Sequence, residues 1–402
     1  MSIIENGCKF LDSKHFVFCC LVWFCLMFTS CKAQTQKSRL VVGADRIEKY
    51  LPILKGRTVG VIANPTSVVN GVHLVDTLLS LKVNIGCVYA PEHGFRGEAE
   101  AGEAVASGID KKSGVKVFSL YGDHKKPSDE SLNGIDVLVF DIQDVGARFY
   151  TYINTLQYIM EAAAKHHLPV LVLDRPNPHG NYVDGPILDT AERSFVGLQQ
   201  IPIVHGLTVG EYANMLIGEY WLADSLQCDL QVISMQNWDR NKVYSLPIAP
   251  SPNLPNDRAI QLYPSLCLFE GTNVSVGRGT SLPFQCYGFP NNKLGDFEFT
   301  PISIPGKSLK PPHENKLCKG YDLSSSDLNL PSGKLELKWL MDAWNSYQDK
   351  SKFFIPFFDK LAGNHILKQQ ISAGWSEEKI RASWEAGLKN YTIIRQKYLL
   401  YR

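Results

Sequence analysis

The first half of the chain contains five short runs of apolar residues, and a polar residue follows each run. The runs are continuous rather than alternating, which is typical of β-strands covered on both faces of a sheet. We therefore predict five buried strands, each with a polar side chain beyond its carboxyl end. They span 58–63, 84–89, 137–140, 170–173 and 201–204, and are followed by Asn64, Glu92, Asp141, Asp174 and His205.

Helical patterns lie between these strands. One stripe, with three- and four-residue spacing, runs through 153–164, and a second continues from Val209 through Leu216, Tyr220 and Ala223. Alternation of strands and helices predicts a parallel sheet with right-handed crossovers, an α/β domain of Rossmann-like type. Because such sheets bind ligands at the carboxyl ends of their strands, the five polar ends are expected in one cleft. A lone Asp after a strand is commonly a helix N-cap, but capping does not explain five polar ends in one register.

Several kinds of chemistry lose support because their motifs are missing. The first strand is followed by Asn64-Pro65-Thr66-Ser67 rather than a Gly-x-Gly-x-x-Gly turn, so we expect no nucleotide. The segment 277–280 is too short for a phosphate-binding loop and lacks its lysine. There is no His-Glu-x-x-His, no Cys-x-x-Cys and no Gly-x-Ser-x-Gly, so no metal, cofactor or serine nucleophile is predicted. Carboxylates, arginines, asparagines and aromatics are typical of a carbohydrate site that uses acid–base catalysis.

Composition and texture predict two domains. The chain has 402 residues, is 45% hydrophobic and carries a net charge of +1, which does not suggest nucleic acid as a partner. A boundary is expected after the proline-rich segment 247–255 and the turn at Pro264. We predict a Rossmann-like catalytic domain over 40–262 and a smaller α/β (α+β) domain over 263–402 that closes the cleft. Expected helices cover 43–50, 335–347, 362–371 and a long stretch from a Ser376 cap.

The N-terminus resembles an export signal. Residues 16–30 are almost wholly apolar and follow Lys9 and Lys14, which fits a signal peptide better than a membrane span. The segment 27–31 resembles a bacterial lipobox with Cys31 as the acylated residue, and ordinary cleavage after Ala33 is the alternative. We expect a signal peptide over 1–31, a tether over 32–39, and a lipoprotein of the periplasm or outer membrane.

The cysteines beyond the signal do not form a regular pattern. Their number is odd, their spacing is wide and their surroundings are mostly apolar, so buried small hydrophobes are a better interpretation than disulfides or a zinc site. These residues are Cys87, Cys228, Cys267, Cys286 and Cys318.

The run 90–97 (Ala-Pro-Glu-His-Gly-Phe-Arg-Gly) places a carboxylate and an imidazole directly after a predicted strand, followed by a guanidinium between two glycines. A salt-bridged loop joining Glu92 to Arg96 is the plainer interpretation for this segment taken alone. The other motifs favour a functional one. They cover 64–67, 91–97, 141–152, 174–178, 183–186, 205–211, 250–255 and 270–280.

Together, in this order, these motifs resemble the exo-β-N-acetylmuramidase (NamZ) family of glycoside hydrolases, from about Leu40 to the C-terminus. The resemblance implies a Rossmann-like domain without a nucleotide, a smaller C-terminal domain and a cleft between them. It also implies release of N-acetylmuramic acid from non-reducing ends of peptidoglycan fragments. Asp184 and Leu254 depart from the family's expected Glu and Met, and the run 177–181 replaces two adjacent glycines.

Hydrolysis of a glycoside requires a carboxylic acid that stays protonated near neutral pH. We assign this role to Glu92, because burial at a strand end is expected to raise its pKa, and the resemblance places the catalytic glutamate there too. Asp141 or Asp144 is the candidate nucleophile or base, unless it orients the 2-acetamido group in a substrate-assisted reaction. The alternative for the whole chain is a non-catalytic muropeptide- or sugar-binding lipoprotein.

Substrate contacts are expected from several further side chains. An arginine suits the lactyl carboxylate of muramic acid, since its fork binds carboxylates bidentately, and there are four candidates. Asp174 is as easily structural, and His93 and His205 are as easily core histidines. Tyr150 is a candidate for stacking on a sugar face, although core packing is the safer interpretation for any one aromatic. The candidate binding residues are Asn64, His93, Arg96, Arg148, Tyr150, Asp174, Arg175, His205, Asn273 and Arg278.

Overall fold

The computed structural model describes residues 39–97, 107–122, 124–325 and 333–402, and residues 40–402 form one compact unit. The predicted signal peptide, Cys31 and all but the last residue of the predicted tether lie outside the described residues. Within those ranges no helix is long and apolar enough to cross a membrane.

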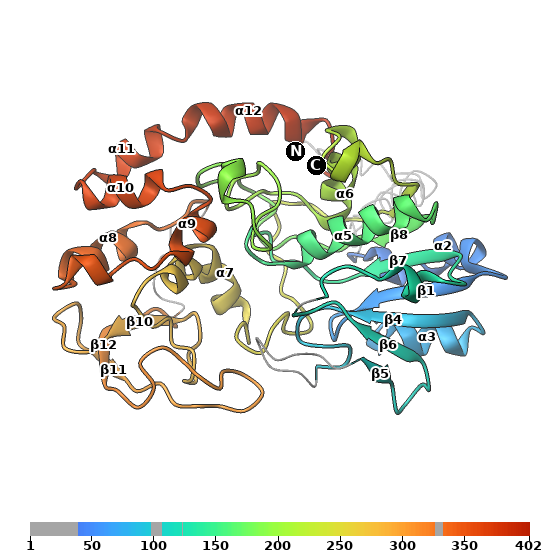
Figure 1. Cartoon of the computed structure of the whole chain (residues 1–402), viewed down its shortest axis with the longest axis horizontal. Coiled ribbons are helices and arrows are strands. Elements are labelled where there is room, and N and C mark those ends of the chain that lie inside the picture. Colours follow the sequence, from blue (N-terminus) through green and yellow to red (C-terminus); the bar gives the residue numbers. More distant parts are fainter. Residues whose placement is uncertain (1–38, 98–106, 123, 326–332) are drawn as a thin grey trace, which may run out of the picture. The chain divides into compact units, whose positions relative to one another are not determined.

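A seven-stranded sheet, on the right in Figure 1, forms the N-terminal part of this unit. Its order is β5-β6-β4-β1-β7-β8-β9, and every pair is parallel except β5 with β6. Without β5, the six parallel strands taken in chain order follow the 3-2-1-4-5-6 order of Rossmann folds. The predicted fold class is confirmed. The strands are β1 (Thr58–Ala63), β4 (Asn84–Ala90), β5 (Gly108–Ile109), β6 (Lys116–Ser119), β7 (Val137–Asp141), β8 (Val170–Leu173) and β9 (Leu230–Ile233).

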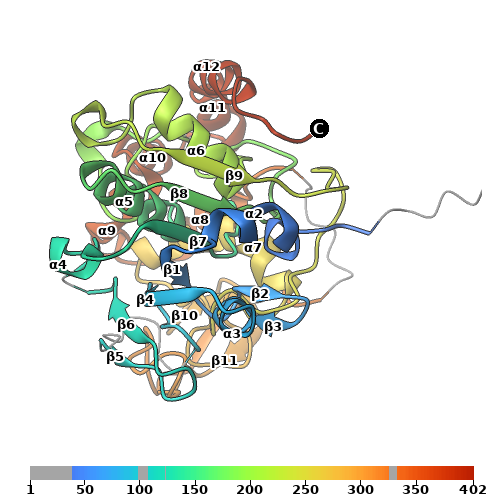
Figure 2. The ribbon, with the colours of Figure 1, turned by 90° about the vertical axis from the view of Figure 1, so that its right-hand side faces the viewer.

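Alternate side chains of the strands enter two separate cores, one on each face of the sheet. Val137 and Val139 pack with helices α2 (Ile47–Leu54) and α3 (Leu74–Ser80). Leu138 and Phe140 pack with α5 (Tyr152–Lys165) and α6 (Val209–Gly218) on the other face. Burial on both faces explains why these strands are continuously apolar in sequence. Figure 2 gives a view of the strands with α2 and α3 beside them.

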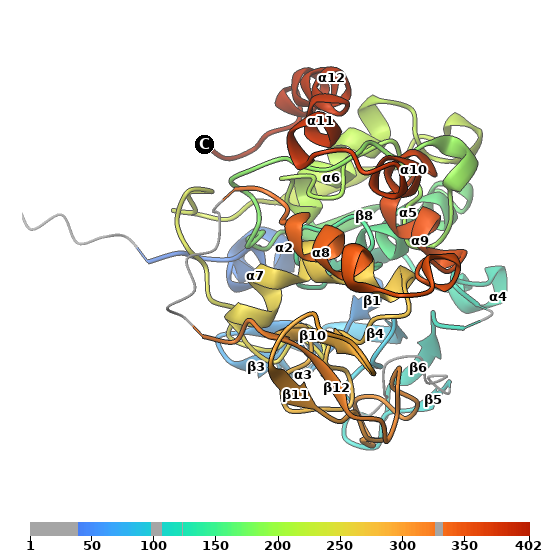
Figure 3. The same cartoon turned by 90° about the vertical axis from the view of Figure 1, so that its left-hand side faces the viewer.

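The C-terminal part combines a small antiparallel sheet with short helices (Figure 3). Its sheet has the order β10-β12-β11. Tyr287 and Phe289 of β10 join the hydrophobic core that contains α5 and α6, whereas Cys286, Phe299 and Cys318 form a small separate cluster. The boundary predicted between 262 and 263 falls inside α7. The elements are α7 (Asp257–Leu266), β10 (Cys286–Phe289), β11 (Phe297–Phe299), β12 (Cys318–Asp322), α8 (Lys338–Ser346), α9 (Phe357–Ala362), α10 (Ile366–Ser372), α11 (Glu377–Ala382) and α12 (Glu385–Gln396).

The remaining elements are short. They are the hairpin strands β2 (Val68–Val69) and β3 (Val72–His73), helix α4 (Asp129–Leu132), and five 3₁₀ helices: η1 (Gly43–Asp45), η2 (Thr190–Glu192), η3 (Ala223–Ser225), η4 (Cys267–Gly271) and η5 (Lys350–Lys352).

The predicted strand over 201–204 is wrong. This segment is buried, but of its residues only Val204 bridges other backbone, at Ala147 and Asp184. Pro202 has no N–H group to offer a sheet, and the carbonyl oxygen of Ile201 accepts hydrogen bonds from the Arg148 guanidinium and from the N–H of Leu188. The place beside β8 belongs to β9, so His205 does not follow a strand of the sheet.

The helix predicted to run from Val209 through Ala223 is too long. Thr208 and Glu211 form a capping box at its start, as the Thr-x-x-Glu spacing indicates. The helix stops at Gly218, and Tyr220, with φ of +57° and 66% exposure, lies outside it. The side chain of Ala223 is exposed as well, so the apparent stripe beyond Leu216 is not a buried face.

The other predicted helices exist with different bounds. The first is a 3₁₀ turn followed by α2, which ends at Leu54 rather than Tyr50. The segment 362–371 is divided by Gly363, whose φ of +79° ends α9. Ser376 does cap a helix, but α11 and α12 are separate helices rather than one. The cysteine prediction is confirmed, since all five cysteines in the described ranges are free and buried.

Candidate active site

The carboxyl edge of the sheet gathers polar side chains, as its parallel order requires. Asn64 follows β1, Glu92 follows β4, and Asp141 ends β7. A further strand that the sequence analysis did not predict, β6, is followed by Tyr121. Burial first, and then the nearby Glu92 carboxyl group, raise the pKa of the Tyr121 hydroxyl to about 12. The strand order reverses between β1 and β7, and ligands of such sheets bind at that point.

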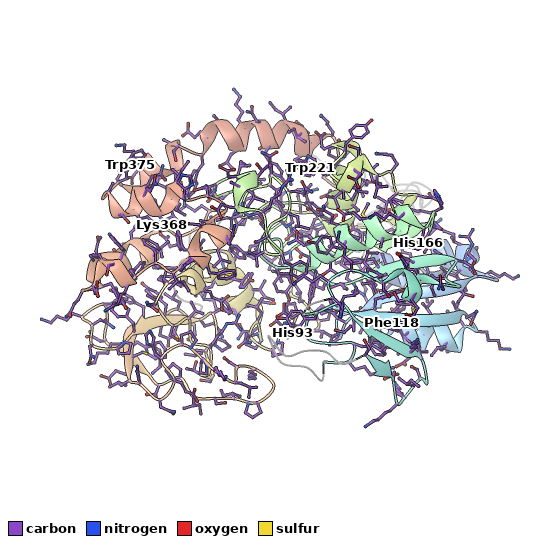
Figure 4. The ribbon with its side chains drawn as sticks, in the orientation of Figure 1. His93, Phe118, His166, Trp221, Lys368 and Trp375 are labelled. Atoms are coloured by element: carbon purple, nitrogen blue, oxygen red, sulfur yellow. The ribbon has the colours of Figure 1, made fainter. Side chains whose placement is uncertain are left out.

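Glu92 belongs to a tight turn that stops β4. The N–H of Gly94 bonds to the carbonyl oxygen of Pro91, and both His93 and Gly94 have positive φ angles, +70° and +76°. A positive φ is uncommon for a histidine, so the surrounding structure must hold this turn in place. The turn directs Glu92 and His93 into a cavity, and Figure 4 shows His93 between the sheet and the C-terminal part.

This cavity has a volume of about 70 Å³, and both parts of the chain contribute to it. Pockets for small molecules measure about 300–1,000 Å³, so it encloses a small part of a glycan at most. Of the described residues that line it, Glu92 is the only carboxylate and Arg278 the only arginine. The lining residues are Glu92, His93, Phe149, Tyr150, Thr151, Tyr152, Ser251, Leu254, Tyr263, Arg278 and Phe284.

Aromatic side chains hold the wall of the cavity rigid. Tyr150 donates a hydrogen bond of 2.7 Å to the carbonyl oxygen of Pro250, and its ring makes edge contacts with Tyr152 and Tyr263. The Tyr152 hydroxyl donates to the carbonyl oxygen of Glu92 at 3.4 Å. These contacts tie the Glu92 turn to the N-terminus of α5 and to α7.

Arg278 enters the cavity from the C-terminal part. Its Nε donates to Oε1 of Glu270 at 2.5 Å, and its guanidinium lies 5.0 Å from the centre of the Phe284 ring. Burial by itself lowers the pKa of Arg278, but the Glu270 carboxylate raises it, so the arginine stays charged. His93 is also close. Burial first, and then the Arg278 charge, lower the pKa of His93 to about 4 and keep it neutral near pH 7.

The other three candidate arginines are held elsewhere. Arg96 pairs with Asp76 at 2.9 Å and with Asp110 at 2.8 Å. The guanidinium of Arg148 is wholly buried and donates to three backbone carbonyl groups, at Pro186, Ile201 and Leu361. Burial lowers the pKa of Arg148 to about 9. Neither residue lines the cavity.

Arg175 and Asp141 form a buried ion pair. Nε and Nη2 of the arginine donate to Oδ1 and Oδ2 of the aspartate at 2.6 and 2.9 Å. Nη2 also donates to the carbonyl oxygen of Val68. Two parallel bonds of this kind satisfy the carboxylate, and Asp141 is fully buried beneath the edge of the sheet.

Asp174 accepts hydrogen bonds from four donors, two of which lie at the start of α6. Its carboxylate accepts from the backbone N–H groups of Arg175 and Gly210 and from the hydroxyl groups of Thr208 and Tyr401. Burial nevertheless raises the pKa of Asp174 to about 6. Because Tyr401 is next to the last residue of the chain, this carboxylate joins the sheet to the C-terminal tail.

Asp144 differs from the two aspartates above. Its Oδ2 accepts from the N–H of Gly146 at 2.6 Å, whereas its buried Oδ1 has no partner among the described residues. Burial raises the pKa of Asp144 to about 7. Nε2 of His205 lies 3.8 Å from Oδ2. Nδ1 of His205 accepts from the N–H of Leu207, so the neutral ring carries its proton on Nε2, facing Asp144.

Two asparagines complete the predicted set. Asn64 uses its side-chain oxygen to bind Thr66 and lies close to the Tyr152 hydroxyl, beside the cavity. Asn273 donates to the carbonyl oxygen of Lys352 and does not line the cavity. Of the predicted site residues, the structure therefore gathers Glu92, His93, Tyr150 and Arg278 around one cavity, with Asn64 next to it.

Some residues at the site were not predictable from the sequence. Tyr121 follows the short strand β6, which begins with the charged Lys116 and has no continuous apolar run that would have predicted it. Glu270 precedes Arg278 by eight residues, a spacing that belongs to no regular element. Ser251 lies in the proline-rich segment 247–255 and Tyr263 precedes the turn at Pro264, where a domain boundary was expected.

Comparisons with known proteins agree on one family. Models of the N-terminal and C-terminal domains of exo-beta-N-acetylmuramidase NamZ match residues 59–258 and 261–401. A Bacillus subtilis protein named peptidoglycan beta-N-acetylmuramidase NamZ is 40% identical over 391 residues, which cover 92% of this chain and 94% of that protein.

Two crystal structures of DUF1343 family proteins from Bacteroides fragilis have the same fold. One is 46% identical with a TM-score of 0.84, and covers 91% of this chain and 99% of its own. The other is 28% identical with a TM-score of 0.75, and covers 90% of this chain and 99% of its own.

Proposed function

The chain belongs to the exo-β-N-acetylmuramidase NamZ family and is a glycoside hydrolase, and we propose that it removes N-acetylmuramic acid from the non-reducing ends of peptidoglycan fragments. The name of the Bacillus subtilis relative, which covers almost the whole chain, supports peptidoglycan as the substrate. A cavity that encloses only a small part of a glycan suits an enzyme that acts on chain ends.

Glu92 is the general acid in this proposal. The observation that carries it is the position of Glu92 as the only carboxylate among the described residues that line the cavity. Burial raises the pKa of Tyr150 and Tyr152, which line the cavity, and of the nearby Tyr121, so all three are neutral at physiological pH. Protonation of the leaving oxygen of a glycoside requires such a group within hydrogen-bond reach of the scissile bond.

In this proposal the second carboxylate that takes part in the reaction is Asp144 rather than Asp141. Both oxygens of Asp141 are bound by Arg175 and the residue is fully buried, so this carboxylate is not accessible to a substrate. Asp144 has an oxygen without a partner in the described residues and lies close enough to Tyr150 and Tyr152 to raise their pKa. In this proposal it acts behind those tyrosines and orients them against the 2-acetamido group of the sugar.

Arg278 recognises the lactyl carboxylate of muramic acid. It is the one of the four candidate arginines that lines the cavity with Glu92. Nη1 and Nη2 have no acceptor among the described residues, whereas Arg96, Arg148 and Arg175 are bonded to carboxylates or backbone carbonyls. A substrate without the carboxylate leaves these two donors unpaired, which disfavours its binding.

The chain is exported and anchored through Cys31 in this proposal. The support is the apolar stretch 16–30 and the lipobox-like segment that ends at Cys31. An enzyme held at a membrane of the cell envelope would meet soluble glycan fragments more readily than the intact wall.

Incubation with a defined glycan of alternating muramic acid and glucosamine residues tests the exo activity. Mass spectrometry should show single N-acetylmuramic acid residues released from the non-reducing end, with internal bonds uncut. Rapid loss of turbidity from intact sacculi would contradict the exo mode.

A further inference from the structure

The pair of Glu270 and Arg278 has a geometry that limits how Arg278 can bind a ligand. A guanidinium grips a carboxylate either side-on, through Nε and one Nη, or end-on, through both Nη nitrogens. Because Nε donates to Glu270 at 2.5 Å, the side-on mode is blocked. Nη1 and Nη2, which have no acceptor in the described part of the chain, are the donors left for the end-on mode.

The backbone beside Arg278 is fixed on both sides. Gly277 and Gly279 have φ angles of +77° and +78°. A Cβ atom at either position would lie 2.4 Å from a backbone carbonyl oxygen, of Leu282 or of Ile302, so only glycine fits. The loop therefore presents Arg278 in one backbone conformation, and the side chain is then held by Glu270 at Nε and by the ring of Phe284.

Glu270 is suited to hold this side chain. It lies on η4 in the C-terminal part, does not line the cavity, and has a side chain 25% exposed against 22% for Arg278. Its other oxygen, Oε2, lies 3.7 Å from the thiol of Cys267, a weak donor. The carboxylate is therefore bound at both ends, and it constrains the long arginine side chain, which otherwise has many rotamers.

We propose that Glu270 is a positioning residue. It holds the Arg278 guanidinium so that Arg278 binds a carboxylate only end-on, through Nη1 and Nη2. The ligand class is a hexosamine with a carboxylate-bearing substituent, placed with that substituent at the Nη edge and its sugar ring toward Glu92. This inference deepens the proposed function and rests on it. Without Glu270 the guanidinium could turn about its long side chain, and the two donors would no longer be aimed at the cavity.

Binding of N-acetylmuramic acid and of its methyl ester to the full-length protein tests this inference. The ester has nearly the same shape but no charge, so the ratio of the two dissociation constants measures how much the charged carboxylate contributes to binding. Isothermal titration calorimetry supplies both constants for the wild type and for Glu270→Ala, Glu270→Gln and Arg278→Lys. The control is Glu298→Ala, which removes a carboxylate of the C-terminal part that pairs with Lys319 and does not line the cavity.

The wild type and Glu298→Ala should prefer the acid. Glu270→Ala should bind the acid at least about tenfold more weakly, the loss expected when charge-assisted hydrogen bonds are misaligned, with little change for the ester. Glu270→Gln keeps an acceptor for Nε and should restore most of the preference. Arg278→Lys has one ammonium group in place of the planar guanidinium and should lose the preference for the acid.

Three results would overturn this inference but not the proposed function. An unchanged preference for the acid in Glu270→Ala is one, and an unchanged preference in Arg278→Lys is another. The third is an equal loss of acid and ester binding in Glu270→Ala, which would indicate a purely structural role for Glu270. If Glu270→Ala does not fold, as judged by circular dichroism, the comparison of Glu270→Gln with Arg278→Lys decides the matter. A wild type that binds acid and ester equally would overturn both this inference and the carboxylate recognition in the proposed function. Hydrolysis by Glu92 would be unaffected by that result.

Discussion

Both oxygens of the Asp141 carboxylate accept hydrogen bonds from Arg175, at 2.6 Å from Nε and 2.9 Å from Nη2. The two side chains are 0% and 3% exposed, so the pair is shielded from water. A carboxylate held in this way supports the sheet edge on which the site stands. Its position at the end of β7 therefore has a structural cause, although the sequence made it a candidate for catalysis.

Asp141→Asn should destabilise the protein by about 3–5 kcal/mol, because it leaves the Arg175 charge buried without a partner. Urea denaturation measures this change. The double variant Asp141→Asn/Arg175→Met should cost less than the sum of the two single variants, since the unpaired charge is gone. Normal stability with lost hydrolysis in Asp141→Asn would show instead that Asp141 takes part in the reaction.

Asp144 predicts a pH dependence of stability. Burial raises its pKa in the folded state to about 7, above the ordinary value of 3.8. The folded state then holds a proton that the unfolded state has lost, so the contribution of this group to stability falls as pH rises from about 4 to 7. The expected loss is on the order of 4 kcal/mol.

Asp144→Asn should remove this loss. Relative to the wild type, the variant should gain stability between pH 4 and pH 8, as measured by urea denaturation at both values. Asp296→Asn, at an exposed position, is the control and should show no such trend. If the difference between Asp144→Asn and the wild type does not vary with pH, the ionised form of Asp144 is not disfavoured in the folded protein.

Substrate discrimination should depend on Arg278. The wild type should hydrolyse a chromogenic β-N-acetylmuramide and leave the matching β-N-acetylglucosaminide nearly untouched, because only the first offers a carboxylate to Arg278. Arg278→Ala should lower kcat/KM for the muramide by about tenfold to a hundredfold, the effect of a lost charged hydrogen bond. Arg96→Ala removes an arginine that pairs with Asp76 and Asp110 outside the cavity, and should keep the discrimination. Comparable rates on both substrates would remove the argument for an arginine.

Anchoring at Cys31 is tested by cell fractionation. The wild type should partition with membranes, and Cys31→Ala should release the protein or block its processing, because the acylated thiol is gone. Cys25→Ala, a change within the same apolar stretch, should leave the distribution as it is. A freely soluble, unlipidated wild type would contradict the anchor but not the catalytic assignment.

The sheet was predictable where burial on both faces gives a strand a continuous apolar sequence. The segments 58–63, 137–140 and 170–173 were found for that reason. Residues 201–204 have the same texture, but the segment is buried by the Arg148 guanidinium and by irregular pairing rather than by a sheet. Strand β9, at the edge of the sheet, has one buried residue, Ile233, and its sequence is interrupted by Gln231, so no apolar run indicated it.

Only the site residues that lie in a motif after a predicted strand could be identified from the sequence. Glu92 and His93 follow a strand within a motif, so the sequence indicated them, whereas Tyr121 follows a strand of four residues that begins with Lys116. Which arginine faces the cavity depends on pairings over long sequence separations, such as Arg96 with Asp76 and Arg148 with Leu361. Sequence spacing carries no record of such contacts, so all four arginines stayed candidates.

The assignment of Glu92 as the general acid is tested by the rate at which Glu92→Gln hydrolyses a chromogenic β-N-acetylmuramide, compared with the wild type. Glutamine keeps the size and hydrogen bonding of Glu92 but has no proton to donate to the leaving group. The rate should fall by about a hundredfold to ten-thousandfold, while the melting temperature barely changes. A variant that unfolds early and keeps normal activity per folded molecule would contradict the account, because Glu92 would then be structural.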